Sequence, residues 1–234
     1  MTLRDHIAFM DAIRAGRFEE FIEEFGPADR VDMMRDIEEV YPLPKRPDPK
    51  RVEAMADKYR VYDDITSMIL SQFIMMEMEI NQGGSSDINL ATIIIRPNDE
   101  EDYDNSDVHY EREHEGNILD EDVLDVSSCI LSMFVNREHT LMKRFAGVLY
   151  DAPVEGEEGE EDAEESAEAA FSKNWFFYAI IRDLAGEDIT KYDFVQNMRM
   201  SDVLVEMAYR RQRDKIIEAR RKEEEARQRA ASLR

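Results

Sequence analysis

The spacing of apolar residues along the chain predicts a protein built almost entirely from α-helices. Near the start, Ile7, Met10 and Ile13 recur at three-residue intervals, which places them on one face of a helix. Thr2 is followed three residues later by Asp5, a spacing typical of the capping box that opens such a helix.

Prolines separate the early helices from a more hydrophobic region. A second short helix is expected over 31–40, and the segment 41–49, which contains four prolines, is expected to be an extended linker. Asp48 is placed as the cap of the next helix, with Pro49 at its first position. The segment 66–80 is apolar on more than one face, so it is predicted to be a helix within the core.

The segment 89–96 is ambiguous between helix and strand. Its residues 92–95 are all β-branched, which favours a strand, whereas the preceding serines and the following Pro97 also suit a buried helix. Because no partner strand is evident elsewhere in the sequence, we interpret it as a helix. Further along, the apolar positions of 122–150 predict a pair of helices with a bend near Asn136.

The densest aromatic segment of the chain lies in its C-terminal third. Residues 171–185 include the only tryptophan, Trp175, and are apolar on nearly every side. They are therefore predicted to form a buried helix that turns at Gly186. Thr190 is placed as the cap of a short helix that follows.

A last, long helix is predicted from Ser201 onwards. Ser201 is its expected cap, and the Met200 and Val205 side chains are expected to pack against each other across that cap. Beyond Tyr209 the chain alternates basic and acidic residues, several of them four apart in the order Glu then Lys or Arg, which is typical of a solvent-exposed helix.

The formal net charge of −24 is concentrated in two tracts. Residues 97–125 hold 13 acidic residues and one arginine, a net charge of −12, and residues 151–168 hold 10 acidic residues without lysine or arginine. Mutual repulsion keeps such tracts solvated, so we interpret them as loops rather than as a rigid mimic of nucleic acid.

These tracts define the predicted organisation of the chain. We expect a helical body over 1–150 with an acidic loop at 97–119, a disordered acidic linker at 151–170, and a C-terminal helical lobe at 171–234. The expected fold class is all-α: an irregular multi-helix bundle with an acidic disordered linker and a long charged C-terminal helix.

Cysteine content and hydropathy indicate a cytoplasmic protein without membrane association. The single cysteine, Cys129, lies in an apolar run and is interpreted as a buried structural thiol. No apolar run reaches the ~20 residues that span a bilayer, and the best one, 68–80, contains two glutamates. Asp5 and His6 interrupt any apolar region of a signal peptide.

The sequence contains no recognisable catalytic pattern, and the sharpest metal candidate is an acidic loop. Asp102, Asp104, Ser106 and Glu113 fall at positions 1, 3, 5 and 12 of a calcium-binding loop. Asp107 stands where that loop needs glycine, so we favour an acidic loop without metal. The four histidines lack the spacing of a zinc site. We therefore expect a protein that is not an enzyme and needs no cofactor.

Protein–protein recognition is the function class that the pattern favours. The basic tail lacks aromatic residues that would stack on bases, and the acidic tracts would repel phosphate, so direct nucleic-acid binding is not expected. An amphipathic start followed by a long charged helix suits recognition of a protein partner, in unknown stoichiometry. The expected contact residues are Trp175, Phe176, Tyr178, Leu204, Met207 and Tyr209.

Two stretches together resemble a known group of proteins. One is Leu90–Pro97 followed by an acidic loop with Tyr103–Asp104, and the other is Leu184–Val195 followed by Met198, Met200 and Val203–Leu204. They resemble small helical assembly proteins encoded in tailed-bacteriophage structural modules, most closely tail assembly chaperones. These motifs are packing patterns rather than chemical signatures, so no functional residue is carried over.

The resemblance implies a non-enzymatic protein that shields an aggregation-prone virion component in the host cytoplasm. Its partner would be a phage structural protein, most plainly one of the tail. Two alternatives stay open at this point. The chain could be a structural component retained in the virion, or an acidic inhibitor of a nucleic-acid-binding protein.

Overall fold

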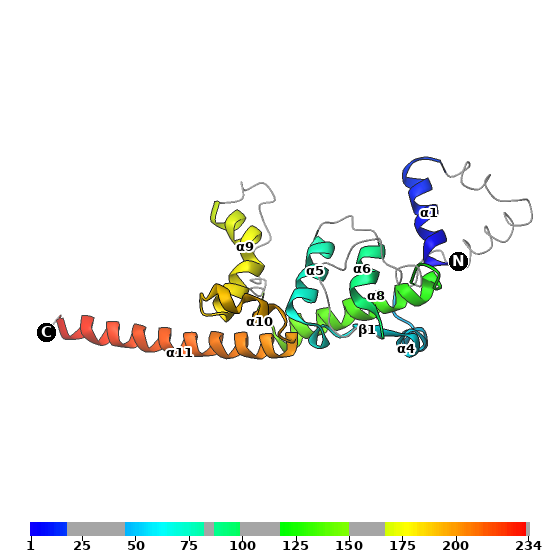
Figure 1. Cartoon of the computed structure of the whole chain (residues 1–234). Coiled ribbons are helices and arrows are strands. Elements are labelled where there is room, and N and C mark those ends of the chain that lie inside the picture. Colours follow the sequence, from blue (N-terminus) through cyan, green and yellow to red (C-terminus); the bar gives the residue numbers. More distant parts are fainter. Residues whose placement is uncertain (18–44, 82–86, 99–117, 150–166, 233–234) are drawn as a thin grey trace, which may run out of the picture. The chain divides into compact units, whose positions relative to one another are not determined.

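The computed structural model describes residues 1–17, 45–81, 87–98, 118–149 and 167–232 (Figure 1). It confirms the all-α class: the described residues form eight α-helices and one two-stranded sheet. The predicted helix over 31–40, residues 99–117 of the predicted acidic loop and residues 151–166 of the predicted linker lie outside the described residues.

The chain divides into two compact units, Met1–Arg137 and Glu138–Arg234. This division differs from the predicted lobes, because residues 138–149 group with the C-terminal unit and not with the N-terminal body. The end of the predicted linker also differs, since helix α9 already begins at Ala167.

The first helix, α1 (Leu3–Arg14), confirms the predicted capping box. The Thr2 hydroxyl accepts from the Asp5 amide at 3.2 Å, and the Asp5 carboxylate accepts from the Thr2 amide at 3.2 Å. The predicted apolar face was wrong, because Ile13 is 46% exposed. The buried positions are Leu3, His6, Phe9 and Ala12.

Backbone pairing with a distant segment decides which face of α1 is buried. Thr2 forms an isolated antiparallel bridge with Asp122, and the Leu3 amide donates to the Glu121 carbonyl at 2.9 Å. This pairing fixes the direction in which the helix leaves the bridge. The buried Leu3, Phe9 and Ala12 also lie at multiples of three residues, so spacing alone does not choose between this face and that of Ile7, Met10 and Ile13.

The segment 89–96 contains both a helix and a strand. Helix α6 (Asp87–Ile94) leads directly into strand β2 (Ile95–Pro97), which pairs antiparallel with β1 (Tyr59–Val61). The expectation that no partner strand exists was therefore wrong. A strand of three residues gives too short an alternation to be recognised in a sequence. Helix α4 (Pro49–Lys58) precedes β1, and its predicted cap is confirmed, because the Asp48 carboxylate accepts from the Lys50 amide at 3.0 Å.

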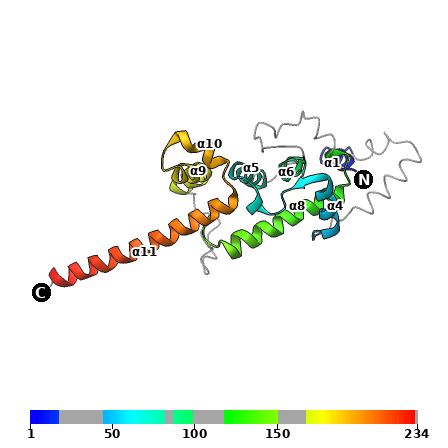
Figure 2. The same cartoon turned by 60° about the horizontal axis from the view of Figure 1, so that its bottom comes forward.

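The core of the first unit lies among α5 (Leu70–Asn81), α6 and α8 (Val123–Glu138). Figure 2 shows α5 and α6 side by side along α8. A 3-10 turn, η1 (Ile65–Ser67), precedes α5, so the predicted core helix is confirmed but starts later than expected. The fully buried side chains here include Met68, Phe73, Met76, Ile93, Ile94, Val126, Cys129 and Met133.

Helix α8 changes its winding just beyond Asn136, close to the position predicted for a bend. The α-helix ends at Glu138 and continues as a π-helix, η3 (His139–Arg144), closed by the Phe145 amide donating to the Thr140 carbonyl at 2.8 Å. The boundary between the two units falls at this change of winding.

The second unit contains α9 (Ala167–Leu184), the 3-10 turn η4 (Ile189–Lys191), α10 (Tyr192–Gln196) and α11 (Met200–Ser232). Its core is formed by Ile180, Ile181, Ala185, Val195, Met200, Val203 and Leu204. The prediction that the aromatic segment is a buried helix was wrong. Among residues 175–184 of α9, the side that carries Ile180 and Ile181 is buried, and Trp175 on the other side is 50% exposed.

The turn after α9 confirms the predicted reversal at Gly186. Gly186 has φ +64° and its amide donates to the Asp183 carbonyl, while the Glu187 amide donates to the Arg182 carbonyl at 2.9 Å. This pair of bonds is a Schellman motif, which closes helices with a residue in the left-handed region. Glycine adopts that region without the steric cost that a side chain brings.

Two predicted caps in this unit were wrong. The short helix α10 has Lys191, not Thr190, at its N-cap position and no side-chain cap there, and Thr190 lies in the preceding turn η4, which is capped by the Asp188 carboxylate accepting from the Thr190 amide at 3.1 Å. Helix α11 begins at Met200, so Ser201 lies within its first turn. Val205 is 59% exposed and therefore does not pack against the buried Met200.

Candidate protein-interaction surface

Exposed apolar side chains gather in the second unit. Of the twelve large hydrophobic residues that are exposed in the described part of the chain, nine lie after Arg137. Where such side chains lie together, exposed apolar surface marks interaction sites in soluble proteins. The nine are Met142, Trp175, Tyr178, Ile189, Phe194, Val205, Tyr209, Ile216 and Ile217.

One group lines a hollow of about 450 Å³ between the end of α9, α10 and the start of α11. We call it the α10–α11 groove. Its floor includes the buried side chains of Ala185 and Val195, and Phe194 and Val205 stand on it 72% and 59% exposed. The apolar lining is completed by Leu184 and Met198, and the polar lining consists of Lys191, Asp202, Glu206 and Arg210.

A tight reversal between α10 and α11 creates this groove. The Met198 amide donates to the Val195 carbonyl at 3.1 Å, and the Asn197 side-chain amide donates to the Asp193 carbonyl at 2.8 Å. Only three residues then separate α10 from α11. This reversal brings Phe194 and Val205, which lie on different helices, to the same hollow.

Arg210 anchors α11 to the end of α9 at the edge of the groove. Its guanidinium donates to the Glu206 carboxylate at 2.7 Å, to the Asp183 carbonyl at 2.7 Å and to the Asp183 carboxylate at 3.0 Å. The hydrogen bond with Glu206, together with the one with Asp183, raises the pKa of Arg210 above the ordinary value of arginine. The groove therefore keeps a fixed positive charge on its rim.

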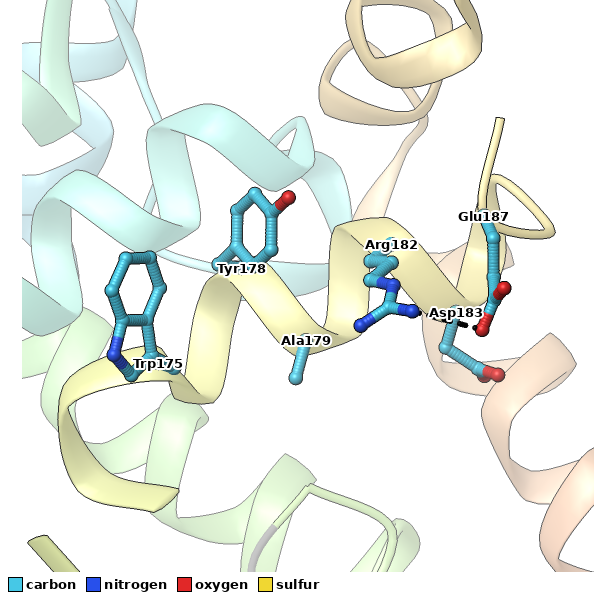
Figure 3. A pocket seen from close by; sticks show the side chains of 6 residues that line it. All are labelled: Trp175, Tyr178, Ala179, Arg182, Asp183 and Glu187. Carbon is cyan, nitrogen blue, oxygen red and sulfur yellow. Dashed lines mark hydrogen bonds and ion pairs between the residues drawn. The ribbon is translucent and has the colours of Figure 1, made fainter. Parts of the chain in front are cut away.

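A second hollow, of about 500 Å³, lies along the exposed side of α9 (Figure 3). It is lined by Trp175, Tyr178, Ala179, Arg182 and Asp183, which we call the α9 face, and by Glu187 from the turn that follows. The Trp175 and Tyr178 rings meet edge to face with centroids 5.5 Å apart. The Arg182 guanidinium lies 3.1 Å from the Glu187 carboxylate.

Tyr192 of α10 supports the aromatic part of the α9 face. Its ring lies 5.9 Å from that of Tyr178 in a T-shaped arrangement, and its hydroxyl donates to the Tyr178 hydroxyl at 3.4 Å. This hydrogen bond, with burial as a second cause, raises the pKa of Tyr192. The rings of Trp175, Tyr178 and Tyr192 therefore form one row.

The structure places the predicted contact residues in three different environments. Trp175, Tyr178 and Tyr209 are exposed, whereas Phe176 and Met207 are half-buried. Leu204 is fully buried in the core of the second unit, so it supports the fold and offers no surface to a partner. The calcium candidates Asp102, Asp104, Ser106 and Glu113 lie outside the described residues.

Sequence reasoning missed the two most exposed apolar residues of the groove. Phe194 falls in the short helix predicted after Thr190, and Val205 is expected to pack against Met200. Neither segment carries a sequence signal for the groove, because the groove depends on the reversal between α10 and α11.

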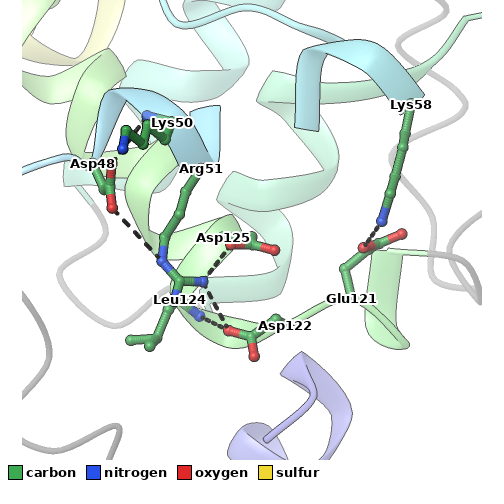
Figure 4. Close-up of polar contacts among 8 residues, drawn as sticks. All are labelled: Asp48, Lys50, Arg51, Lys58, Glu121, Asp122, Leu124 and Asp125. Atoms are coloured by element: carbon green, nitrogen blue, oxygen red, sulfur yellow. Dashed lines mark hydrogen bonds and ion pairs between the residues drawn. The ribbon is translucent and has the colours of Figure 1, made fainter. Parts of the chain in front are cut away.

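The polar clusters of the described residues join elements of the fold to each other. In the first unit, Arg51 of α4 contacts the carboxylates of Asp48, Asp122 and Asp125 (Figure 4). Nearby, Lys58 donates to Glu121 at 2.7 Å. These contacts tie α4 to the start of α8. Within the described ranges, no group of three or more His, Cys, Asp or Glu side chains is arranged to hold a metal ion.

Comparison of the chain with known protein families, with curated proteins and with solved structures finds no match. No helix in the described part of the chain is long and apolar enough to cross a membrane. The geometry of the second unit is therefore the basis for a functional proposal.

Proposed function

We propose that this protein is a non-enzymatic adaptor that holds an amphipathic helical segment of a partner protein in the α10–α11 groove. The observation that carries the proposal is the pair Phe194 and Val205, which are 72% and 59% exposed beside a floor of buried apolar side chains. An apolar helix face laid into such a groove is a common mode of protein recognition.

Burial of the exposed groove residues supplies the driving force. Covering one large apolar side chain contributes about 1.5–3 kcal/mol, and a docked helix would cover both Phe194 and Val205. Its own apolar residues would be covered at the same time. This burial energy is enough for reversible binding but not for permanent association. An assembly chaperone requires reversible binding.

The rim of the groove would orient the partner. Lys191 and Arg210 carry positive charges, while Asp202 and Glu206 carry negative charges. A partner helix with acidic and basic residues flanking its apolar stripe can complement both sets. Charge complementarity of this kind contributes more to specificity than to affinity.

We further propose that the partner is a structural protein of a tailed bacteriophage, and that the adaptor shields it during virion assembly. This step is supported by the resemblance of Leu90–Pro97 and Leu184–Val195 to tail assembly chaperones. A chaperone of this class needs an accessible apolar surface on a soluble carrier. The α10–α11 groove is suited to that task.

The test begins with identification of the partner by co-purification from native host lysate. The helical segment of that partner is then titrated as a synthetic peptide against the whole protein. We expect Phe194→Asp to weaken binding by at least about tenfold, because one buried apolar contact is replaced by a desolvated charge. Val135→Asp is the matched control, since Val135 is 54% exposed in the first unit.

Each outcome has a distinct meaning. Equal affinity of the Phe194→Asp variant and the original protein would show that the groove is not the binding site. If no virion protein binds, the proposed role in phage assembly is wrong. Presence of the protein in purified virions would favour a retained structural component. Recovery of a nuclease or polymerase would instead favour the acidic inhibitor.

A further inference from the structure

We infer that the α9 face is a self-recognition surface, on which a second copy of this chain packs its own α9 in the antiparallel direction. The inference rests on the order of four exposed residues, Trp175, Tyr178, Ala179 and Arg182, along one side of the helix. Their sizes and charges match when the helix is paired with a reversed copy of itself.

A two-fold axis passing between positions 178 and 179 generates the pairing. Around that axis, Trp175 of one copy faces Arg182 of the second copy, and Tyr178 faces Ala179. Every contact then occurs twice, as in all interfaces with two-fold symmetry. A parallel pairing would instead place the two Arg182 guanidinium groups against each other, which is unfavourable.

The facing residues complement each other chemically. A guanidinium group over the face of an indole ring is the most favourable of the cation–π pairs available to protein side chains. The Tyr178 ring can fill the recess left above the small side chain of Ala179, as a knob fills a hole between packed helices. Trp, Tyr and Arg are also the residue types that contribute most to binding energy at interfaces.

The contact that Arg182 makes within its own unit is weak enough to be exchanged for a contact across an interface. Arg182 is bound to Glu187 only through an ion pair whose side chains are 53% and 74% exposed, and such pairs contribute little stability. The opposite side of α9 is already committed to the core through Ile180 and Ile181. The side of α9 that carries Trp175, Ala179 and Arg182 is exposed to solvent.

Pairing on the α9 face would be weak and reversible. Helix α9 has 18 residues, which gives a length of ~27 Å. One helix pair of this length buries less than the ~800 Å² per partner of a standard stable interface. The α10–α11 groove uses other side chains, so a dimer would present two grooves.

The first test measures the mass of the whole protein as a function of concentration by sedimentation velocity. A chain of 27.4 kDa is expected to approach twice that mass as its concentration rises. Arg182→Glu should raise the protein concentration at which half of the chains are dimeric by at least about tenfold, because a carboxylate would then face the indole ring. Arg199→Glu is the matched control, since it changes the charge equally at another exposed position of the unit.

A mixing experiment tests the antiparallel register itself. Trp175→Lys alone should remain monomeric, because lysine would face Arg182, and Arg182→Glu alone should do the same. In an equal mixture the introduced lysine of one variant faces the introduced glutamate of the other, while the native Trp175–Arg182 contact is kept. The mixture should therefore recover the dimer, with circular dichroism confirming that both variants are folded.

Three results would overturn the inference. The first is a monomer at all concentrations, and the second is a dimer unaffected by Arg182→Glu. The third is failure of the mixture to pair although both variants are folded. Self-association is tested independently of the proposed adaptor role. Phe194→Asp should weaken partner binding without changing the concentration dependence of the sedimentation mass.

Discussion

Burial changes the acid–base behaviour of two side chains in the first unit. Cys129 is fully buried, and burial, aided by the nearby Asp63 and Asp125 carboxylates, raises its thiol pKa from 9.0 to about 12. Burial and a 3.0 Å hydrogen bond to Glu121 raise the pKa of Tyr59 from 10.0 to about 12. The predicted structural role of Cys129 as a buried thiol is thereby confirmed.

These shifts predict that the first unit loses stability in alkaline solution. Both folded pKa values lie above the unfolded values, so the stabilisation is complete below about pH 9 and is lost as the pH rises towards about 12. Urea midpoints measured between those limits should fall steadily. Cys129→Ala should reduce the slope of that fall, and an unchanged midpoint across the range would contradict the prediction.

A buried ion pair joins two helices of the first unit. Glu77 of α5 has a side chain only 1% exposed, and Arg137 of α8 donates to it through two guanidinium nitrogens, one at 2.6 Å. Removing one member of such a pair leaves a charge in a low-dielectric interior. Replacing both by apolar residues of similar volume avoids that cost.

The Arg137→Met variant is accordingly expected to lose about 3–5 kcal/mol of the free energy of unfolding. The double variant Glu77→Met with Arg137→Met should recover most of that loss. Urea unfolding of the original protein, both single variants and the double variant gives the coupling energy directly. A double variant as unstable as Arg137→Met alone would show that the pair is not what holds α5 against α8.

Local signals of the sequence predicted helix ends, and tertiary contacts decided the rest. The caps at Thr2 and Asp48 and the turn at Gly186 depend on neighbouring residues only, so they could be recognised directly. The buried face of α1 depends on a bridge to Asp122, more than a hundred residues away. Within α1, two sets of positions share the same three-residue spacing, so periodicity alone could not choose the buried one.

The candidate surface was foreseen in part for the same reason. Trp175 and Tyr178 could be proposed as contact residues from their type alone, although the helix that carries them was expected to be buried. Phe194 and Val205 meet only because the chain reverses between α10 and α11. Their juxtaposition is a property of the fold and could not be inferred from either segment.

The whole molecule contains a natural reporter in each unit. Its only cysteine, Cys129, lies in the first unit and its only tryptophan, Trp175, in the second. Each unit has its own buried core, one around Phe73 and Met76 and the other around Val203. Reactivity of the buried thiol therefore reports on the core of the first unit, and fluorescence of the half-exposed indole reports on helix α9 of the second.

We expect the two reporters to give different urea midpoints. Gly186→Ala should lower the urea midpoint measured by tryptophan fluorescence, because a side chain at φ +64° costs about 1–2 kcal/mol. It should leave the midpoint measured by thiol reactivity unchanged. Gly186→Asn, which tolerates this conformation better, is the control. Coincident midpoints that shift together would mean that the chain unfolds as one cooperative unit.

Helix α11 gives the molecule a spacer of defined length. It runs for 33 residues, or ~50 Å, and its distal turns are held by surface pairs such as Glu218–Lys222 at 2.7 Å. Arg229 consequently stands ~30 Å along the helix axis from Arg210 at the groove. A partner bound in the groove and a second component bound near Arg229 would therefore be separated by the length of the intervening helix.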